Sequence, residues 1–493
     1  MSTKLRSTKL LSAHNNSQIL LAALLTMPFT SVIADIQPRS ASLNYSQKSL
    51  SNAGNPAAAA LIVERKDPHV MTGGLIELGV GLEYGDLDDL FEKINEFAEE
   101  HRPPDNGDDG NDRPPTPENP IRDYTWEDLF QEYPELEDRL DIIKDKVTDA
   151  AAIAALIAAE GYGKAEITSE ASFVLNEDLY GGTLLMGMSY KGNAKTVGIF
   201  QDIDFDAEQA KAALSTIPDF SPDDPLQELD LSGGITLYYN PSNQKIKFTI
   251  DNDSFLLVKA TKIAQFSLSY SKKALEHEQG SLYWGVKPSF YQVGLTNVST
   301  RFGDITDAEA LLQDIKDADF INKTGFDVDL GLVWAANNYQ LGASVVNLIE
   351  QKYKYPELDR SRFSSIDVLK QIDYHEEFTM QRQVKLEAGI FTEDRQWSLH
   401  TELDANPVED PMRDRYQWFT LTAGYATDSW WLPGARFGMS RNLAGTKLGY
   451  LNAGITFMKF INLDVATTLD QVHLDGKDIR RGLSVRLGVQ FDY

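Results

Sequence analysis

Apolar and polar residues alternate along most of the chain from about residue 165 to its end. In the last eleven residues the apolar side chains share one face, and these are Leu483, Val485, Leu487, Val489, Phe491 and Tyr493. The residues between them are polar or glycine. The same alternation occurs in 76–84, 326–334 and 397–404. Because successive side chains of a strand point to opposite faces, each stretch is predicted to be a β-strand with one apolar face.

The length of these stretches favours a membrane barrel over a soluble sandwich. Many run for about 10–13 residues, whereas strands of globular sheets average five or six and a tilted membrane crossing takes about 9–11. Aromatic residues gather near the expected strand ends, as in Tyr283-Trp284 and Trp430-Trp431, which is typical of interfacial girdles. The fold class predicted is therefore all-β: a transmembrane antiparallel β-barrel of about 14–16 strands with short helical insertions.

The N-terminus has the pattern of an export signal. In residues 1–34, three basic residues precede the apolar stretch 19–25, and small or medium side chains permit cleavage after Ala34. Residues 35–74 are polar and alanine-rich and are expected to form a plug-like segment, and 75–493 is expected to form the barrel. The chain contains no cysteine, so disulfides, zinc–thiolate sites and iron–sulfur clusters are excluded. An exported chain without cysteine fits a bacterial envelope.

The acidity of the chain is concentrated in one insertion. The formal charge is −28, and residues 86–145 alone carry 21 acidic and six basic side chains. Such a chain is not expected to bind nucleic acid directly, because it has no basic stripe to neutralise phosphates. The insertion is placed at 86–162, and its Pro/Gly-rich middle, 103–120, is expected to stay extended.

A strand count predicts on which side of the membrane this insertion lies. Counting back from a periplasmic C-terminus predicts that 86–162 lies in the periplasm. The same count predicts that four other long loops lie on the outer side, namely 204–227, 296–323, 349–378 and 405–415.

A search for catalytic chemistry finds one polar cluster. His400, Glu402 and Asp404 alternate along one strand face, so all three are expected to point into the lumen as a polar cluster. Ser398 lies on the same face and could complete a hydrolase. However, the sequence contains no H-E-x-x-H metal motif and no G-x-S-x-G nucleophile elbow. No enzyme activity and no cofactor or metal are expected, and an outer-membrane hydrolase is the least favoured alternative.

The end of the chain resembles that of bacterial outer-membrane barrels, whose assembly machinery recognises an alternating last strand with a C-terminal aromatic. The resemblance implies an assembly signal formed by Leu487, Val489, Phe491 and Tyr493. It also implies that the protein is located in the outer membrane and that its partners are outer-membrane lipid and the barrel-assembly machinery.

A narrower resemblance is to the plasmid-transfer TraF-like outer-membrane family, which is related to FadL-type hydrocarbon channels. It is carried by Asn55-Pro56-Ala57 after a segment that begins at Arg39, and by the stretches 269–293 and 397–425. The resemblance implies a non-enzymatic barrel linked to conjugative transfer, with components of a conjugation apparatus as partners. The alternative that it leaves open is a FadL-like channel for hydrophobic small molecules.

Overall fold

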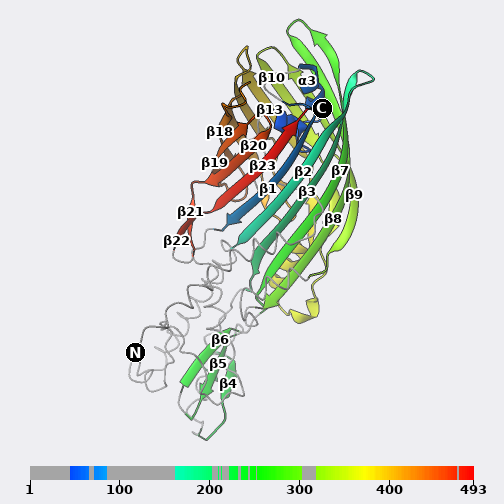
Figure 1. Ribbon diagram of the computed structural model, residues 1–493. Coiled ribbons are helices and arrows are strands. Elements are labelled where there is room, and N and C mark those ends of the chain that lie inside the picture. The colour runs from blue at the N-terminus through cyan, green and yellow to red at the C-terminus, as the bar shows by residue number, and fades with distance from the viewer. Residues whose placement is uncertain are drawn as a thin grey trace, which may run out of the picture.

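Fourteen strands of the described chain close into one antiparallel barrel (Figure 1). The computed structural model describes residues 45–65, 71–85, 162–201, 209, 212–213, 221, 223–230, 235–242, 245–250, 253–301, 318–474 and 477–492. The expected signal peptide, nearly all of the acidic insertion and Tyr493 lie outside the described residues. The predicted all-β barrel of 14–16 strands is confirmed.

The barrel strands follow one another in chain order around the wall. They are β1 (Gly74–Tyr84), β2 (Gly163–Leu179), β3 (Gly182–Ile199), β7 (Phe255–His277), β8 (Gly280–Arg301), β9 (Ile321–Ala335), β10 (Tyr339–Val346), β13 (Gln383–Phe391), β14 (Trp397–Asp404), β17 (Trp418–Tyr425), β18 (Gly434–Asn442), β19 (Gly449–Phe457), β20 (Ile461–Thr468) and β23 (Gly482–Phe491). β1 pairs with β2 on one side and with β23 on the other. The wall therefore has no open edge, which is the condition for placing strands in lipid.

Smaller elements lie in the connections and inside the barrel. Short sheets are formed by β4 (Gln227–Asp230), β5 (Ile235–Asn240) and β6 (Lys245–Ile250), by β11 (Gln351–Lys354) and β12 (Glu377–Met380), by β15 (Val408–Glu409) and β16 (Arg415–Tyr416), and by β21 (Gln471–Leu474) and β22 (Lys477–Arg480). The helical elements in the described part of the chain include α2 (Tyr45–Leu50), α3 (Ala58–Arg65), the 3₁₀ turn η3 (Arg360–Arg362) and α9 (Ile366–Glu376). None of the helices in the described residues is long and apolar enough to cross a membrane.

The two faces of the wall have the polarity of a membrane barrel. In β23, the apolar row is open to the surroundings, with Leu487 51% and Val489 38% exposed. The alternate row, which includes Arg486 and Gln490, is buried in the lumen. The alternating pattern of the sequence thus places polar side chains inside and apolar side chains outside, the reverse of a soluble sandwich.

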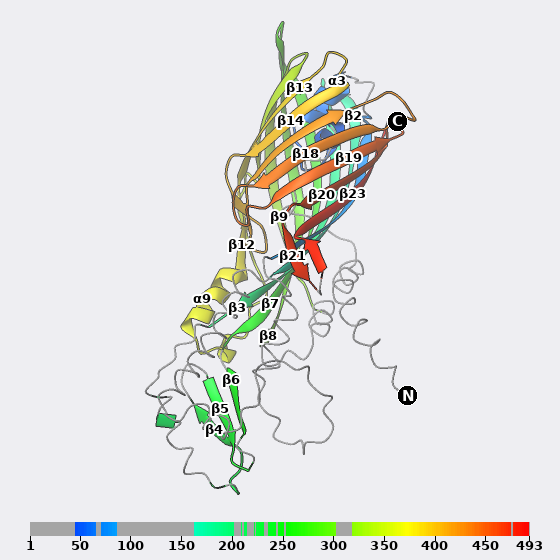
Figure 2. The ribbon, with the colours of Figure 1, turned by 90° about the vertical axis from the view of Figure 1, so that its left-hand side faces the viewer.

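The neighbouring strands β3, β7 and β8 extend beyond the rest of the wall at one end. β7 and β8 have 23 and 22 residues, whereas β14 has eight. One face of this extension is covered by α9, which begins after the N-cap Ser365 (Figure 2). The apolar cluster between them consists of Ile199, Phe255, Leu257, Phe363, Val368 and Ile372. The extension therefore provides the surface on which α9 packs beyond that end of the barrel.

The connections differ in length at the two ends of the barrel. At one end, which we call the turn end, the short turns lie beside the last strand's C-terminus, as between Leu179 and Gly182. At the other, which we call the loop end, the long connections 200–254, 302–320, 347–382 and 405–417 leave the wall. This asymmetry is typical of outer-membrane barrels, whose longer loops face outward.

The acidic insertion leaves the wall at the loop end. Its flanking residues are joined there, because the Gly85 N–H donates to the Tyr162 carbonyl at 2.7 Å. The prediction that 86–162 lies on the opposite side from the other four long loops is therefore wrong. The strand count takes 194–203 and 246–256 as separate strands. In the structure, 194–203 is mostly the end of β3, and 246–256 spans β6, which lies outside the barrel, and the start of β7.

Leu487 provides a test of which face meets lipid. A Leu487→Arg variant should lose about 2–4 kcal/mol of stability, because it would place a charge on the exposed apolar row. The expected readout is a smaller fraction of heat-modifiable folded protein on gels, while Leu487→Met keeps the wild-type fraction. Equal behaviour of the two variants would contradict the assignment of this row to lipid.

Candidate functional site

The lumen at the turn end is filled by a plug that consists of residues 45–65. α2 and α3 lie inside the wall, with α3 at the end where the C-terminus lies (Figure 1). Small side chains let α3 pack closely, and its residues Ala58 to Val63 are all buried. Leu50 and Ala59 pack against Leu75 of β1, and Leu61 packs against Tyr283 of β8. The plug is thus held by apolar contacts to separate parts of the wall.

Asn52 ties the plug to the β3–β7–β8 side of the lumen. Its Nδ2 donates to Ser189 Oγ at 2.6 Å and to Gln265 Oε1 at 2.8 Å, and its Oδ1 accepts from Ser267 Oγ at 2.6 Å. Lys287 donates to the Asn52 carbonyl oxygen. Asn52 is buried, so loss of its side chain would leave several lumen groups without a partner.

Asn55-Pro56-Ala57 docks on a smooth part of the wall made by two glycines. A Cβ on Gly285 would lie 2.3 Å from the Pro56 carbonyl carbon, and a Cβ on Gly331 would lie 2.1 Å from Asn55 Oδ1. Only glycine allows the plug to come this close. The Asn55 Nδ2 donates to the Leu332 carbonyl at 3.1 Å. The motif that carried the family resemblance is therefore the docking turn of the plug.

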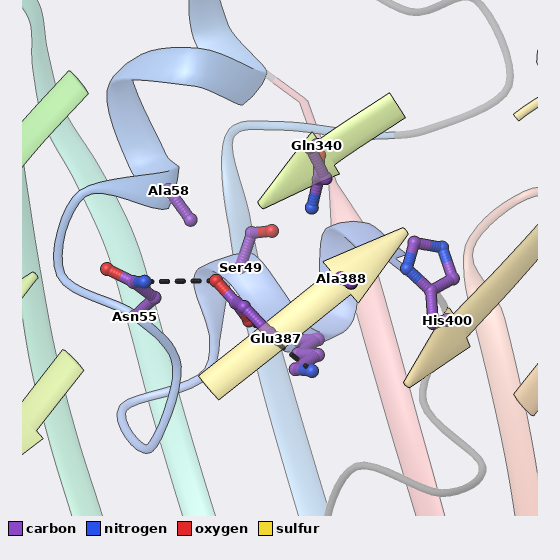
Figure 3. A pocket seen from close by; sticks show the side chains of 8 residues that line it. Ser49, Asn55, Ala58, Gln340, Glu387, Ala388 and His400 are labelled. Carbon is purple, nitrogen blue, oxygen red and sulfur yellow. Dashed lines mark hydrogen bonds and ion pairs between the residues drawn. The ribbon is translucent and has the colours of Figure 1, made fainter. Parts of the chain in front are cut away.

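The predicted polar cluster on β14 is only partly assembled (Figure 3). Glu402 pairs with Lys48 of the plug at 2.7 Å, and Glu387 of β13 pairs with the same ammonium at 3.4 Å. His400 lines a small cavity beside these groups and the plug residue Asn55, which donates to Glu387 at 3.0 Å. The cavity has room for about one water molecule.

Asp404 lies away from this cavity and from the Lys48–Glu402 pair. Its Oδ2 accepts from the Trp418 N–H at 2.8 Å, at the end of β14. The carboxylate therefore fixes the start of β17, and the site formed by β14 consists of His400 and Glu402.

A second segment, residues 405–417, folds into the lumen from the loop end, and we call it the strap. Its Asp410 and Met412 are buried. Lys164 of β2 binds Asp410, and also Asp414 at 2.8 Å, while its Nζ donates to the Tyr416 hydroxyl at 2.7 Å.

Two further lysines on neighbouring strands hold the strap. Lys195 of β3 binds Asp414 at 2.5 Å. Lys259 of β7 donates to the Pro411 carbonyl at 3.1 Å and lies 4.2 Å from the centre of the Tyr355 ring. The Tyr355 hydroxyl donates to the same carbonyl at 2.9 Å.

The charges around the strap set the protonation of its groups. Burial alone would raise the pKa of Asp414, but the ammonium groups of Lys164 and Lys195 outweigh it and hold the pKa below its usual range. Burial, together with the cations Lys259 and Lys195, lowers the pKa of His375 at the end of α9 to about 3. Around neutral pH the strap therefore carries a charged Asp414 beside a neutral His375.

Other charges of the lumen also form close pairs. Two pairs join neighbouring strands, Lys191–Glu166 at 3.0 Å and Lys287–Asp329 at 2.7 Å. A third, Arg436–Asp464 at 2.7 Å, joins β18 to β20 across Gly454 of the strand between them, β19. Within the described residues, no group of three or more His, Asp or Glu side chains is arranged to hold a metal ion. The described lumen is a network of paired charges and polar contacts.

Sequence reasoning missed the residues that close the lumen. Lys48, Asn52 and Lys164 have no motif around them, and their partners are far away in the chain. Lys164 and Asp414, for example, are 250 positions apart. Only the alternation of each strand could have marked Lys164 as facing the lumen, and its partner required the fold of the strap.

Of the residues predicted to form the assembly signal, three lie on the outer face of β23. Leu487 and Val489 are exposed, and Phe491 contacts Phe173 of β2, with ring centres 5.9 Å apart. Tyr493 lies outside the described residues. The signal itself stays a prediction.

Comparison with known proteins finds a family and a set of similar solved structures. Residues 52–404 match the family model described as "F plasmid transfer operon, TraF, protein". No curated protein matches the sequence. A "TodX deltaS2S3 mutant monoaromatic hydrocarbon channel" is 9% identical over 92% of this chain and 99% of its own, with a TM-score of 0.41. A FadL homologue from Pseudomonas aeruginosa is 13% identical over 94% and 100%, with a TM-score of 0.30.

The docking of the plug can be tested at Asn52. An Asn52→Ala variant should loosen the plug, because each buried partner left without a hydrogen bond costs about 1–3 kcal/mol. Trypsin should then cleave the purified protein after Lys48, which is protected in the wild type by its contacts with Glu387 and Glu402.

The matched control is Asn176→Ala, which removes an exposed asparagine from β2 near the turn end. This variant should keep Lys48 protected. Unchanged protection in Asn52→Ala would show that Asn52 does not hold the plug.

Proposed function

This chain belongs to the F plasmid transfer operon TraF family, and from that premise we propose a non-enzymatic outer-membrane β-barrel linked to conjugative transfer. The observation that supports it most is the closed 14-strand wall with apolar side chains outside and paired charges inside. Such a wall satisfies its backbone in lipid. We propose that the protein is exported to the bacterial outer membrane, where the barrel-assembly machinery inserts it.

The filled lumen favours a role at the membrane surface over free passage of solutes. The plug occupies the turn end, and the strap occupies the loop end. Both are bound through buried ion pairs and hydrogen bonds. We propose that the long connections of the loop end carry the contacts to components of a conjugation apparatus, and that no direct contact with nucleic acid is involved.

A channel for hydrophobic small molecules is the second candidate. The plug inside the barrel favours it, because such a channel needs a segment that controls passage. The lining of the described lumen disfavours it, since charged pairs such as Arg436–Asp464 and Lys287–Asp329 offer no apolar path. The plasmid-transfer role is therefore the primary proposal.

We propose no catalytic role for the polar cluster on β14. Glu402 is bound to Lys48 of the plug, and the cavity beside His400 has room for about one water molecule. A hydrolase would need room for its substrate beside a nucleophile, and a cavity of this size has none.

The orientation of the barrel predicts which side the acidic insertion reaches. Long loops of outer-membrane barrels face outward, and both flanks of 86–162 lie at the loop end. Protease added to intact cells should therefore cleave the Pro/Gly-rich stretch 103–120. Protection until the envelope is opened would place the loop end in the periplasm.

The biological role can be tested with a clean deletion. Loss of the protein should lower plasmid-transfer frequency by an order of magnitude or more, and the wild-type gene should restore it. Complementation with Leu487→Arg should restore it poorly, because assembly is impaired. Unchanged transfer together with reduced uptake of a hydrophobic compound would favour the channel instead.

A further inference from the structure

The strap starts and ends on one wall but is bound by the wall opposite. It leaves at the end of β14 and returns at the start of β17, the ninth and tenth strands of the barrel. Its anchors lie on β2, β3 and β7, the second to fourth strands. These two groups are half a circumference apart in a barrel of 14 strands. The strap therefore crosses the whole mouth of the lumen.

The three anchoring lysines lie at one level of the wall. Lys164 is paired in register with Lys195, and Lys195 is paired with Lys259. All three side chains are buried. They meet Asp414, Asp410 and the Pro411 carbonyl on the strap. A buried charge is stable only with its partner in place, so the wall and the strap depend on each other.

A buried polar side chain lies behind the strap without a hydrogen-bond partner in the described residues. Asn193 lies on β3 two residues from Lys195, on the side toward the turn end, and is paired in register with Glu166 and Thr261. Only 1% of its surface is exposed, and neither atom of its amide has a hydrogen-bond partner in the described part of the chain. Buried amides are normally satisfied by protein or by ordered water. The region next to Asn193 is thus suited to hydration.

We propose that the strap is a closure of the loop-end mouth, and that its release opens the lumen behind it to small hydrophilic solutes. The lysines of β2, β3 and β7 hold the closed position, and the strands of the wall need not move. The inference rests on the proposed outer-membrane orientation only for the side from which a solute arrives.

Mild acid does not release such a strap. Asp414 faces Lys164 of β2, Lys195 of β3, Glu83 of β1 and His375 of α9. The pKa of Asp414 is lower in the folded protein than in the unfolded chain. Its contribution to the stability of the closed strap is therefore present above the unfolded pKa and is lost only as pH falls through the lower, folded pKa. Release therefore requires a competing partner for the carboxylates or the lysines.

The absence of cysteine makes a direct test possible, since any introduced thiol is the only one in the chain. In the Asn193→Cys variant, a small cationic methanethiosulfonate reagent added to intact cells should not label the protein. When Asp410→Asn and Asp414→Asn are added to Asn193→Cys, labelling should become rapid. Heat-modifiable mobility on gels checks that the barrel is folded.

Matched controls separate release of the strap from loss of charge. Asp367→Asn with Asp373→Asn removes two exposed carboxylates from α9 and should leave the introduced thiol protected. In an otherwise wild-type chain, Ser361→Cys, in the exposed η3, should be labelled readily and shows that the reagent reaches the loop end.

Tyr355→Phe is a milder second variant, in case the two strap substitutions prevent folding. It removes only the hydroxyl that donates to Pro411, and it should raise the labelling rate at position 193 by a smaller factor. Labelling with the strap intact, or no labelling in a folded barrel whose strap bonds are removed, would overturn the proposal. Either result leaves the plasmid-transfer experiment to be judged separately.

Discussion

Closure of the wall is the constraint on which the rest of this structure depends. Pairing of β1 with β23 closes the ring of strands, so that the barrel has no edge strand with unpaired backbone groups. Lipid around the wall then requires the apolar rows to face outward. The polar rows must then face the lumen, where charges such as Lys164 and Arg486 are buried. Each of these charges needs a partner, because an unpaired buried charge is strongly destabilising.

The partners are supplied partly by the wall and partly by chain segments that enter it. Arg436 of β18 and Asp464 of β20 satisfy each other across the intervening strand β19. Lys164 has its carboxylate partners on the strap, and Glu402 has its partner on the plug. The plug and the strap are therefore part of the interior in the same sense as a hydrophobic core is in a soluble protein.

The sequence predicts what depends on local pattern and misses what depends on distant contacts. Alternation in 76–84, 326–334 and 397–404 corresponds to β1, β9 and β14, and the outward row of β23 was also predicted. The predicted side of the acidic insertion is wrong, because one miscounted strand moves every connection before it to the opposite side of the membrane. His400 and Glu402 were found, but Lys48 was not, since its partner Glu387 lies 339 positions away in the sequence.

The position of the plug also sets an order of assembly. Residues 45–65 precede every barrel strand in the chain, yet Asn55 binds Glu387, 332 positions later. Its docking surface on Gly285 and Gly331 lies on the fifth and sixth strands of the wall, and Glu387 lies on the eighth. The plug is therefore made before every strand of the wall, but it can dock only once the strands that hold it have formed. Until then, the apolar side of α3 must be sheltered by something other than the barrel.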